Sequence, residues 1–347
     1  MANIFARSPY IIEINETGQV ETKIELRLWN GSGSAPSSPQ YILSKLIPAT
    51  NAPATYYDLS PYIREFIEHD SLQSQPTTNG ATPSAQWCNV QVKKYKRVTT
   101  SFTQVGSTLN YKGFDGYGYF EQGYNPTLSD ILLPQGNYYY ESTSEVGWVT
   151  VFTETVAKAR WTNINTNATQ LITLPSNAVR DVSRVYSGWE TAGNKLELLD
   201  SSNGVLWTSY FYPKDECKYT PVQIDFVNKF GAWQREWFFK ASYDSLTVDN
   251  KEYNTLPSQY PNYLQTQGQR NVFNSNGKQT IRVNTDWVDE SYSETIKQIL
   301  LSEKILINEK AAKINTKSTE LFKSINTKMI NYQLEFEYAF DTINSVI

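Results

Sequence analysis

The end of the chain carries a regular alternation of apolar and polar residues. From Tyr332 to Phe340 every second residue is aromatic or leucine, and the residues between them are Gln333, Glu335, Glu337 and Ala339. Successive side chains of a β-strand point to opposite faces, so this pattern predicts a strand with one buried face. Such a long strand needs a neighbour for its backbone groups, either in the same chain or in a second subunit.

Similar patterns recur along the chain and predict a mainly β fold. Aromatic residues make up 14% of the 347 residues, and aromatic side chains suit half-buried strands. Alternation is clear at 23–29 and 222–226, and the sequence Asp200–Gly204 predicts a hairpin turn. Short strands separated by turns are typical of β-sandwiches.

We expect three parts from this organisation. Residues 1–140 and 141–255 are predicted to form two β-sandwich domains of immunoglobulin-like or jelly-roll-like type. Residues 256–347 are predicted to form a mixed α/β assembly segment, and the polar stretch 254–280 is predicted to be a linker or an extended arm.

Two short helices are predicted from their start signals. Ser60 is a predicted N-cap with Pro61 at the first helical position. Ser291 and Glu294 fit a capping box that opens a second helix.

Composition argues against several functional classes. With 31 Lys and Arg against 35 Asp and Glu, the formal charge is −4, which disfavours recognition of nucleic acid. No apolar run approaches the roughly 20 residues of a membrane helix, and the N-terminus has no apolar stretch of signal-peptide length. A single histidine and two cysteines argue against a His/Cys metal site and a Ser–His triad. We therefore predict a protein made without export that needs no metal and no cofactor.

The acidic residues do not form a recognisable catalytic motif. Asp225 and Glu236 are the candidates for a glycosidase pair, but both lie on the polar phase of predicted strands, where solvation or salt bridging is the stronger expectation. Asp115 and Asp200 fit turns better than calcium ligands. We predict no catalytic residue.

The remaining singular residues have structural interpretations. His69 follows the first predicted helix, where a cation suits the helix dipole. Cys88 and Cys217 lie in different predicted domains and are expected to be buried free thiols.

Two groups of aromatic residues are predicted to form contacts between subunits. The glycine-rich segment 113–124 (GFDGYGYFEQGY) supplies Tyr117, Tyr119, Phe120 and Tyr124, for which packing between subunits is favoured over stacking on sugar. The terminal strand supplies Tyr332, Phe336 and Tyr338, for which the core of the same chain is nearly as good an explanation.

Three blocks of sequence resemble virion structural proteins of tailed bacteriophages, particularly those of crAss-like and related phages of Bacteroidetes hosts. The blocks are FARSPYIIEI with IELRLWNG and DLSPYIREFI, then KYTPVQIDFVNKFGAWQREWFFK, and finally ILLSEKILI followed by INTKMINYQLEFEYAFDTINSV. The resemblance implies a tail or neck component, such as a ring or adaptor between portal and tail barrel or an anchor for tail fibres. It implies no enzymatic activity and no cofactor.

The same resemblance implies partners and a location. The chain is expected to associate with itself in a ring of about 6 or 12 copies, and with other tail, portal and fibre proteins. It is expected in the tail or neck of the virion after synthesis in the cytoplasm of the bacterial host.

Three other functions remain open from the sequence. The first alternative is a receptor-binding module that grips host-surface glycan, which exposed coplanar aromatic rings beside Asp or Asn would favour. A glycan-cleaving tail enzyme requires two facing carboxylates about 5–10 Å apart. The last is a globular β protein with an unrelated cellular role.

Overall fold

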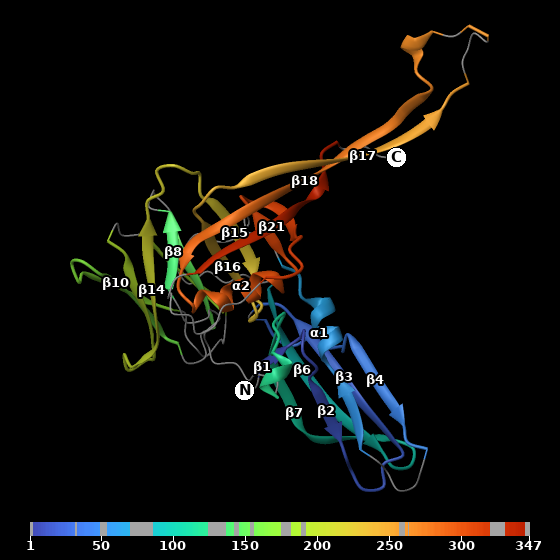
Figure 1. Ribbon diagram of the computed structural model, residues 1–347. Coiled ribbons are helices and arrows are strands. Elements are labelled where there is room, and N and C mark those ends of the chain that lie inside the picture. Colours follow the sequence, from blue (N-terminus) through green and yellow to red (C-terminus); the bar gives the residue numbers. More distant parts are fainter. Residues whose placement is uncertain are drawn as a thin grey trace. The chain divides into compact units, whose positions relative to one another are not determined.

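The computed structural model of the chain is mainly β, as the sequence predicts (Figure 1). It describes residues 3–31, 33–48, 54–69, 86–123, 137–141, 146–152, 156–174, 182–188, 192–256, 261–262, 264–319 and 330–343. The chain divides into two compact units, Met1–Asp215 with Phe226–Arg235 and Glu216–Asp225 with Glu236–Ile347. The division into three parts at 140 and 255 stays a prediction.

The first unit begins with a five-stranded sheet and a small two-stranded sheet. The order of the larger sheet is β1 (Asn3–Phe5), β7 (Phe102–Phe114), β6 (Trp87–Arg97), β3 (Glu21–Trp29) and β4 (Tyr41–Leu46). β1 runs parallel to β7, and the other neighbours are antiparallel. The small sheet pairs β2 (Ile11–Ile14) with β5 (Thr55–Asp58), after which the chain forms α1 (Ser60–Phe66).

One hydrophobic core joins these two sheets and α1. On β3 the side chains of Ile24, Leu26 and Leu28 are at most 1% exposed, which confirms the alternation predicted there. Ile12 of β2 and Ile63 of α1 belong to the same core. This arrangement is that of a small β-sandwich, because two sheets enclose one apolar layer.

The first unit contains two further sheets. The larger one has the order β11 (Thr169–Thr173), β10 (Lys158–Asn163), β13 (Asn194–Leu199), β14 (Val205–Lys214) and β8 (Asn137–Glu141), and the smaller one pairs β9 (Val146–Phe152) with β12 (Val182–Gly188). The predicted turn between β13 and β14 is confirmed. Asp200 Oδ1 accepts the backbone N–H groups of Ser202 at 2.8 Å and Gly204 at 2.7 Å, which closes the turn.

A seven-stranded sheet forms most of the second unit. Its order is β16 (Trp233–Phe238), β15 (Val222–Val227), β19 (Ile305–Ile307), β20 (Lys310–Ile314), β21 (Ile330–Asp341), β18 (Arg270–Val288) and β17 (Tyr243–Asn254). Residues 226–235, which contain the turn between β15 and β16, are grouped with the first unit. The helix α2 (Tyr292–Leu300) follows β18 and buries Tyr292, Ile296 and Ile299. The terminal strand β21 therefore pairs within its own chain, between β20 and β18.

The prediction that β15 and β16 have a solvated polar phase is wrong. All residues of β15 are buried, and the exposed fraction is 0% for Asp225 and 1% for Glu236 on β16. The polar groups are retained in the interior because they have hydrogen-bond partners. Gln223 Nε2 donates to Asp225 Oδ2 at 2.5 Å, and the Tyr292 hydroxyl donates to Glu236 Oε2 at 3.0 Å.

Both helices begin without the side-chain caps that the sequence predicts. Leu59 is the N-cap of α1, and the Ser60 hydroxyl donates instead to the carbonyl of Ser8 at 2.6 Å. Asp58 takes the capping role, since its Oδ1 accepts the N–H of Ser60 at 3.0 Å. Ser291 is the N-cap of α2, but its hydroxyl bonds to Asp289 rather than to the helix backbone.

Candidate assembly surfaces

A two-stranded ribbon, formed by β17 and the first residues of β18 (Arg270–Gly277), projects from the seven-stranded sheet (Figure 1). β17 pairs with β18 from Tyr243 opposite Arg282 to Asn254 opposite Arg270. β21 accompanies β18 only as far as Lys278, opposite Asp341. Beyond that residue the described ribbon has two strands, and the 3₁₀ helix η3 (Gln265–Gln267) lies near its end.

The ribbon exposes large apolar side chains to solvent. Every residue of β17 is exposed. The large apolar side chains of the ribbon have exposed fractions from 48% to 62%, and they are Tyr243, Leu246, Val248, Tyr253, Val272 and Phe273. Burying one such side chain contributes about 1.5–3 kcal/mol, whereas an isolated two-stranded hairpin is only marginally stable in water. A partner that covers the ribbon would therefore stabilise it.

The edges and the charge of the ribbon also suit association. β17 is the last strand of the sheet, so one side of its backbone has no strand beside it among the described residues. Its acidic side chains are Asp244, Asp249 and Glu252, and its basic ones are Lys251 and Arg270, so its formal charge is −1. Such a small net charge opposes close approach to another subunit only weakly.

The base of the ribbon is fastened to the end of the chain. Thr342 N donates to the carbonyl of Gly277 at 2.8 Å, and the Asn276 amide exchanges two hydrogen bonds of 2.9 Å with the backbone of Ile343. A Cβ atom at Gly277 would lie 2.7 Å from Leu246 Cδ1, because the leucine side chain crosses the glycine. These contacts hold the ribbon at its attachment to β21.

The glycine-rich segment 113–124 does not expose all the aromatic residues predicted for an interface. Tyr117 is 8% exposed, and its ring lies 4.7 Å below the guanidinium carbon of Arg7. Tyr119 is half-buried and contacts Tyr117 edge to face at 5.7 Å. Phe120 begins the 3₁₀ helix η2 (Phe120–Gln122) and is fully exposed, while Tyr124 lies outside the described residues. Of the three described members of this predicted group, Phe120 is the most exposed.

The aromatic residues predicted on the terminal strand lie in the core of the second unit. Tyr332, Phe336 and Tyr338 are 2%, 0% and 8% exposed. Burial raises the pKa of the Tyr338 hydroxyl, and the nearby carboxylate of Asp244 raises it further. Within one chain these residues pack the sheet, which is the alternative that the sequence left open.

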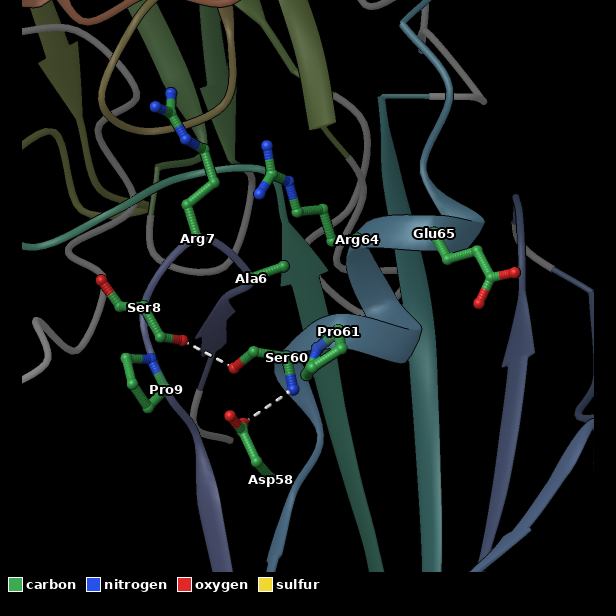
Figure 2. Close-up of a pocket in the computed structure, with 9 residues that line it drawn as sticks. All are labelled: Ala6, Arg7, Ser8, Pro9, Asp58, Ser60, Pro61, Arg64 and Glu65. Carbon is green, nitrogen blue, oxygen red and sulfur yellow. Dashed lines mark hydrogen bonds between the residues drawn. The ribbon is translucent and has the colours of Figure 1, made fainter.

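A pocket of 480 Å³ lies between the N-terminal segment and α1 (Figure 2). Its lining residues are Ala6, Arg7, Ser8, Pro9, Asp58, Ser60, Pro61, Arg64 and Glu65. Figure 2 shows the side chains of Arg7 and Arg64 pointing to the same side, away from Asp58. Two cations and two carboxylates balance its charge.

The polar groups of this pocket serve the fold. Asp58 Oδ1 accepts the N–H groups of Tyr10 at 3.1 Å and of Ser60. Ser60 Oγ accepts a second bond from Tyr10 N at 2.8 Å. The hydrogen bonds that line the pocket therefore connect the N-terminal segment to the start of α1.

His69 pairs with a carboxylate and does not cap α1, so its predicted role is wrong. Its side chain is 3% exposed, and Nε2 lies 3.1 Å from Asp115 Oδ2. The ring also meets Trp233 edge to face at 6.2 Å. Asp115 Oδ1 lies 3.9 Å from Arg64 Nε, so this carboxylate faces a histidine and an arginine rather than a cluster of calcium ligands.

The thiols are free, but only one is buried. Cys88 is fully buried, whereas Cys217 is exposed, which corrects the prediction for the second cysteine. Among the described residues, no group of three or more His, Cys, Asp or Glu side chains is placed to hold a metal ion. Within the same parts of the chain, no helix is long and apolar enough to cross a membrane.

The sequence predicted a linker or an extended arm at 254–280, but it did not single out the exposed apolar residues of the ribbon, several of which precede residue 254. Leu246 and Val248 share one strand face and were available as a signal, since the register places them beside Gln279 and Gly277. The surrounding Asn, Ser and Gln residues dilute this pattern. The extension of β17 and β18 beyond the end of β21 becomes evident only from the strand pairing.

The comparisons with known proteins give no relative: no protein-family model matches the chain, and no curated protein matches it.

Proposed function

We propose that this chain is a non-enzymatic structural subunit of a bacteriophage tail, which assembles with further copies of itself into a ring or adaptor. The observation that carries the assembly role is the exposed ribbon of β17 and β18. The phage assignment rests on the sequence resemblance. A portal–tail position and the anchoring of fibres are two versions of the same proposal.

Ring formation needs a surface on one subunit that meets a different surface on the next. The ribbon suits this role because it reaches beyond its own sheet and offers backbone edges as well as apolar side chains. Strand addition supplies backbone hydrogen bonds, and the exposed leucine, valine and aromatic residues supply buried area. The buried aromatic residues of β21 pack the sheet from which the ribbon projects.

The test is the mass of the protein in solution, measured by light scattering. We compare the full chain with a variant in which Asn-Gly replaces residues 249–276, so that a tight turn joins Val248 to Gly277. We expect a closed oligomer of about 6 or 12 copies for the full chain and a folded monomer for the variant.

A matched control changes an exposed apolar residue elsewhere. Leu171→Asp on β11 alters a side chain that is 54% exposed, as Leu246 is, and we expect it to leave the oligomer intact. A full chain that stays monomeric at all concentrations, or a shortened variant that still assembles, contradicts the proposal.

A further inference from the structure

The sheet of β11, β10, β13, β14 and β8 has one buried face and an outer face that is partly exposed. On β14 the side chains of Trp207, Ser209 and Phe211 are at most 5% exposed and point to the core. Phe211 stacks on Tyr138 at 4.9 Å and meets Trp161 edge to face at 5.3 Å. The core is thus filled without the alternate residues of β14, which lie on the outer face.

Three tyrosines lie together on this outer face. The rings of Tyr210 and Tyr212 are 6.2 Å apart and parallel to within 8°. Tyr139 is the register partner of Tyr212 on β8, and their rings are also 6.2 Å apart. Tyr210 is 37% exposed although it is aromatic, and Asn137 is its register partner. We call Tyr139, Tyr210 and Tyr212 the tyrosine platform.

Charged side chains border the platform on the same face. Lys195 lies opposite Tyr210, and both Lys195 and Arg160 bind Glu197, at 2.6 and 2.7 Å. Lys214 Nζ lies 5.5 Å from the centre of the Tyr139 ring. Among the described side chains, the outer positions of these strands carry the four cations Lys158, Arg160, Lys195 and Lys214 against the carboxylate of Glu197. The face is therefore locally positive in a chain of formal charge −4.

We propose that this face binds an acidic polysaccharide, with sugar rings on the tyrosine platform and sugar carboxylates at Arg160 and Lys195. The C–H face of a pyranose ring is apolar and packs on an aromatic ring, while its hydroxyls meet the tyrosine hydroxyls. The excess of cations is complementary to a polymer that carries carboxylates.

The mixed charges favour a sugar polymer over a nucleic acid. Glu197 is buried and is paired with both Arg160 and Lys195, so it offsets part of their charge and leaves the face less positive than a phosphate-binding surface usually is. This inference does not depend on ring assembly, because binding and oligomeric state are measured separately.

The test is affinity electrophoresis of the full chain in native gels that contain polygalacturonate, with dextran as the neutral polymer. We expect polygalacturonate to retard the protein and dextran to have little effect. Tyr210→Ala and Tyr212→Ala should each weaken binding about tenfold, which corresponds to about 1.4 kcal/mol. Arg160→Gln should weaken binding and reduce its dependence on salt.

Two controls keep the result interpretable. Tyr56→Ala removes a tyrosine that is 53% exposed on β5, and it should bind as the full chain does. Tyr210→Phe retains the ring if Tyr210→Ala fails to fold, and it should keep most of the affinity. Four results would overturn the proposal. They are no retardation by polygalacturonate, Tyr210→Ala and Tyr212→Ala variants that bind as tightly as the full chain, equal retardation in dextran, and tighter binding of oligodeoxythymidine than of polygalacturonate.

Discussion

Glu197 shows how a buried carboxylate is kept ionised by its neighbours. Burial raises the pKa of this group, but hydrogen bonds and charges from Lys195 and Arg160 outweigh burial, and the pKa lies below its ordinary value. The carboxylate is 7% exposed and bonds to both cations. Its ionised form therefore stabilises the folded state.

This arrangement predicts a pH-dependent contribution to stability. Because the folded pKa is below that of the unfolded chain, about 4.3, the unfolded state takes up the proton first as pH falls. The stabilisation is complete above pH about 4.3 and is lost as pH falls through the folded pKa. We expect Glu197→Gln to be less stable than the parent chain at pH 7 and closer to it at pH 3. Urea unfolding at both pH values measures the two differences, and an equal difference at both contradicts the assignment.

The two cysteines provide a second prediction at this scale. Burial raises the pKa of the Cys88 thiol to about 12, whereas Cys217 is exposed. Only the thiolate reacts, and at pH 8 about one in 10⁴ of the Cys88 thiols is ionised. We expect a thiol reagent to label one cysteine per folded chain and none in Cys217→Ser. Labelling of Cys217→Ser without denaturant contradicts the burial of Cys88.

At the scale of single elements, α2 is attached to the sheet through a buried hydrogen bond. The Tyr292 hydroxyl donates to Glu236 Oε2 at 3.0 Å, and both residues are at most 5% exposed. We expect Tyr292→Phe to destabilise the chain by about 1–3 kcal/mol, because a buried acceptor loses a donor. Urea unfolding measures this loss.

The matched control for α2 is Tyr253→Phe on the ribbon. Its side chain is 48% exposed, so water can replace any bond that the hydroxyl makes, and we expect a change of no more than about 0.5 kcal/mol. Equal losses for the two variants would show that the Tyr292 bond contributes nothing particular to the attachment of α2.

The alternation of apolar and polar residues predicted the strands well where one face of a sheet is exposed to solvent. Ile24, Leu26 and Leu28 are buried as expected, and β21 keeps the alternation from Tyr332 to Tyr338, whereas Phe340 is 49% exposed. The same rule failed at Asp225 because β15 is buried on both faces, which depends on what covers the second face. Local alternation carries no information about that second layer.

Helix starts and interface residues show the same limit. Ser60 and Ser291 have suitable side chains for capping, yet tertiary partners and a nearby aspartate take their hydroxyls. Tyr117 lies in a glycine-rich segment whose composition is typical of an exposed loop, but its ring packs against the guanidinium group of Arg7. Exposed coplanar aromatic rings were expected only as a sign of the alternative glycan-binding function, and no residues were named for them. The three residues of the tyrosine platform come together through the pairing of β8 with β14.

At the scale of the whole molecule, the exposed ribbon and the buried terminal strand have different roles. β21 lies inside the seven-stranded sheet and contributes Leu334 and Phe336, which are fully buried. The ribbon contributes exposed residues and adds little to the core. We therefore expect folding to depend on β21, and we propose that association between copies depends on the ribbon.

Two deletions separate these roles in one experiment. Removing residues 323–347 takes away β21, and each large core side chain lost costs about 3–5 kcal/mol, which together exceeds the total stability of about 5–15 kcal/mol. We expect the second unit of this truncated chain to lose its cooperative unfolding transition. Circular dichroism during heating measures this transition. The variant that joins Val248 to Gly277 should keep its transition within a few degrees, because it removes exposed residues. If the truncated chain instead unfolds cooperatively as a monomer, β21 is dispensable for the fold, and assembly belongs to the terminal strand rather than to the ribbon.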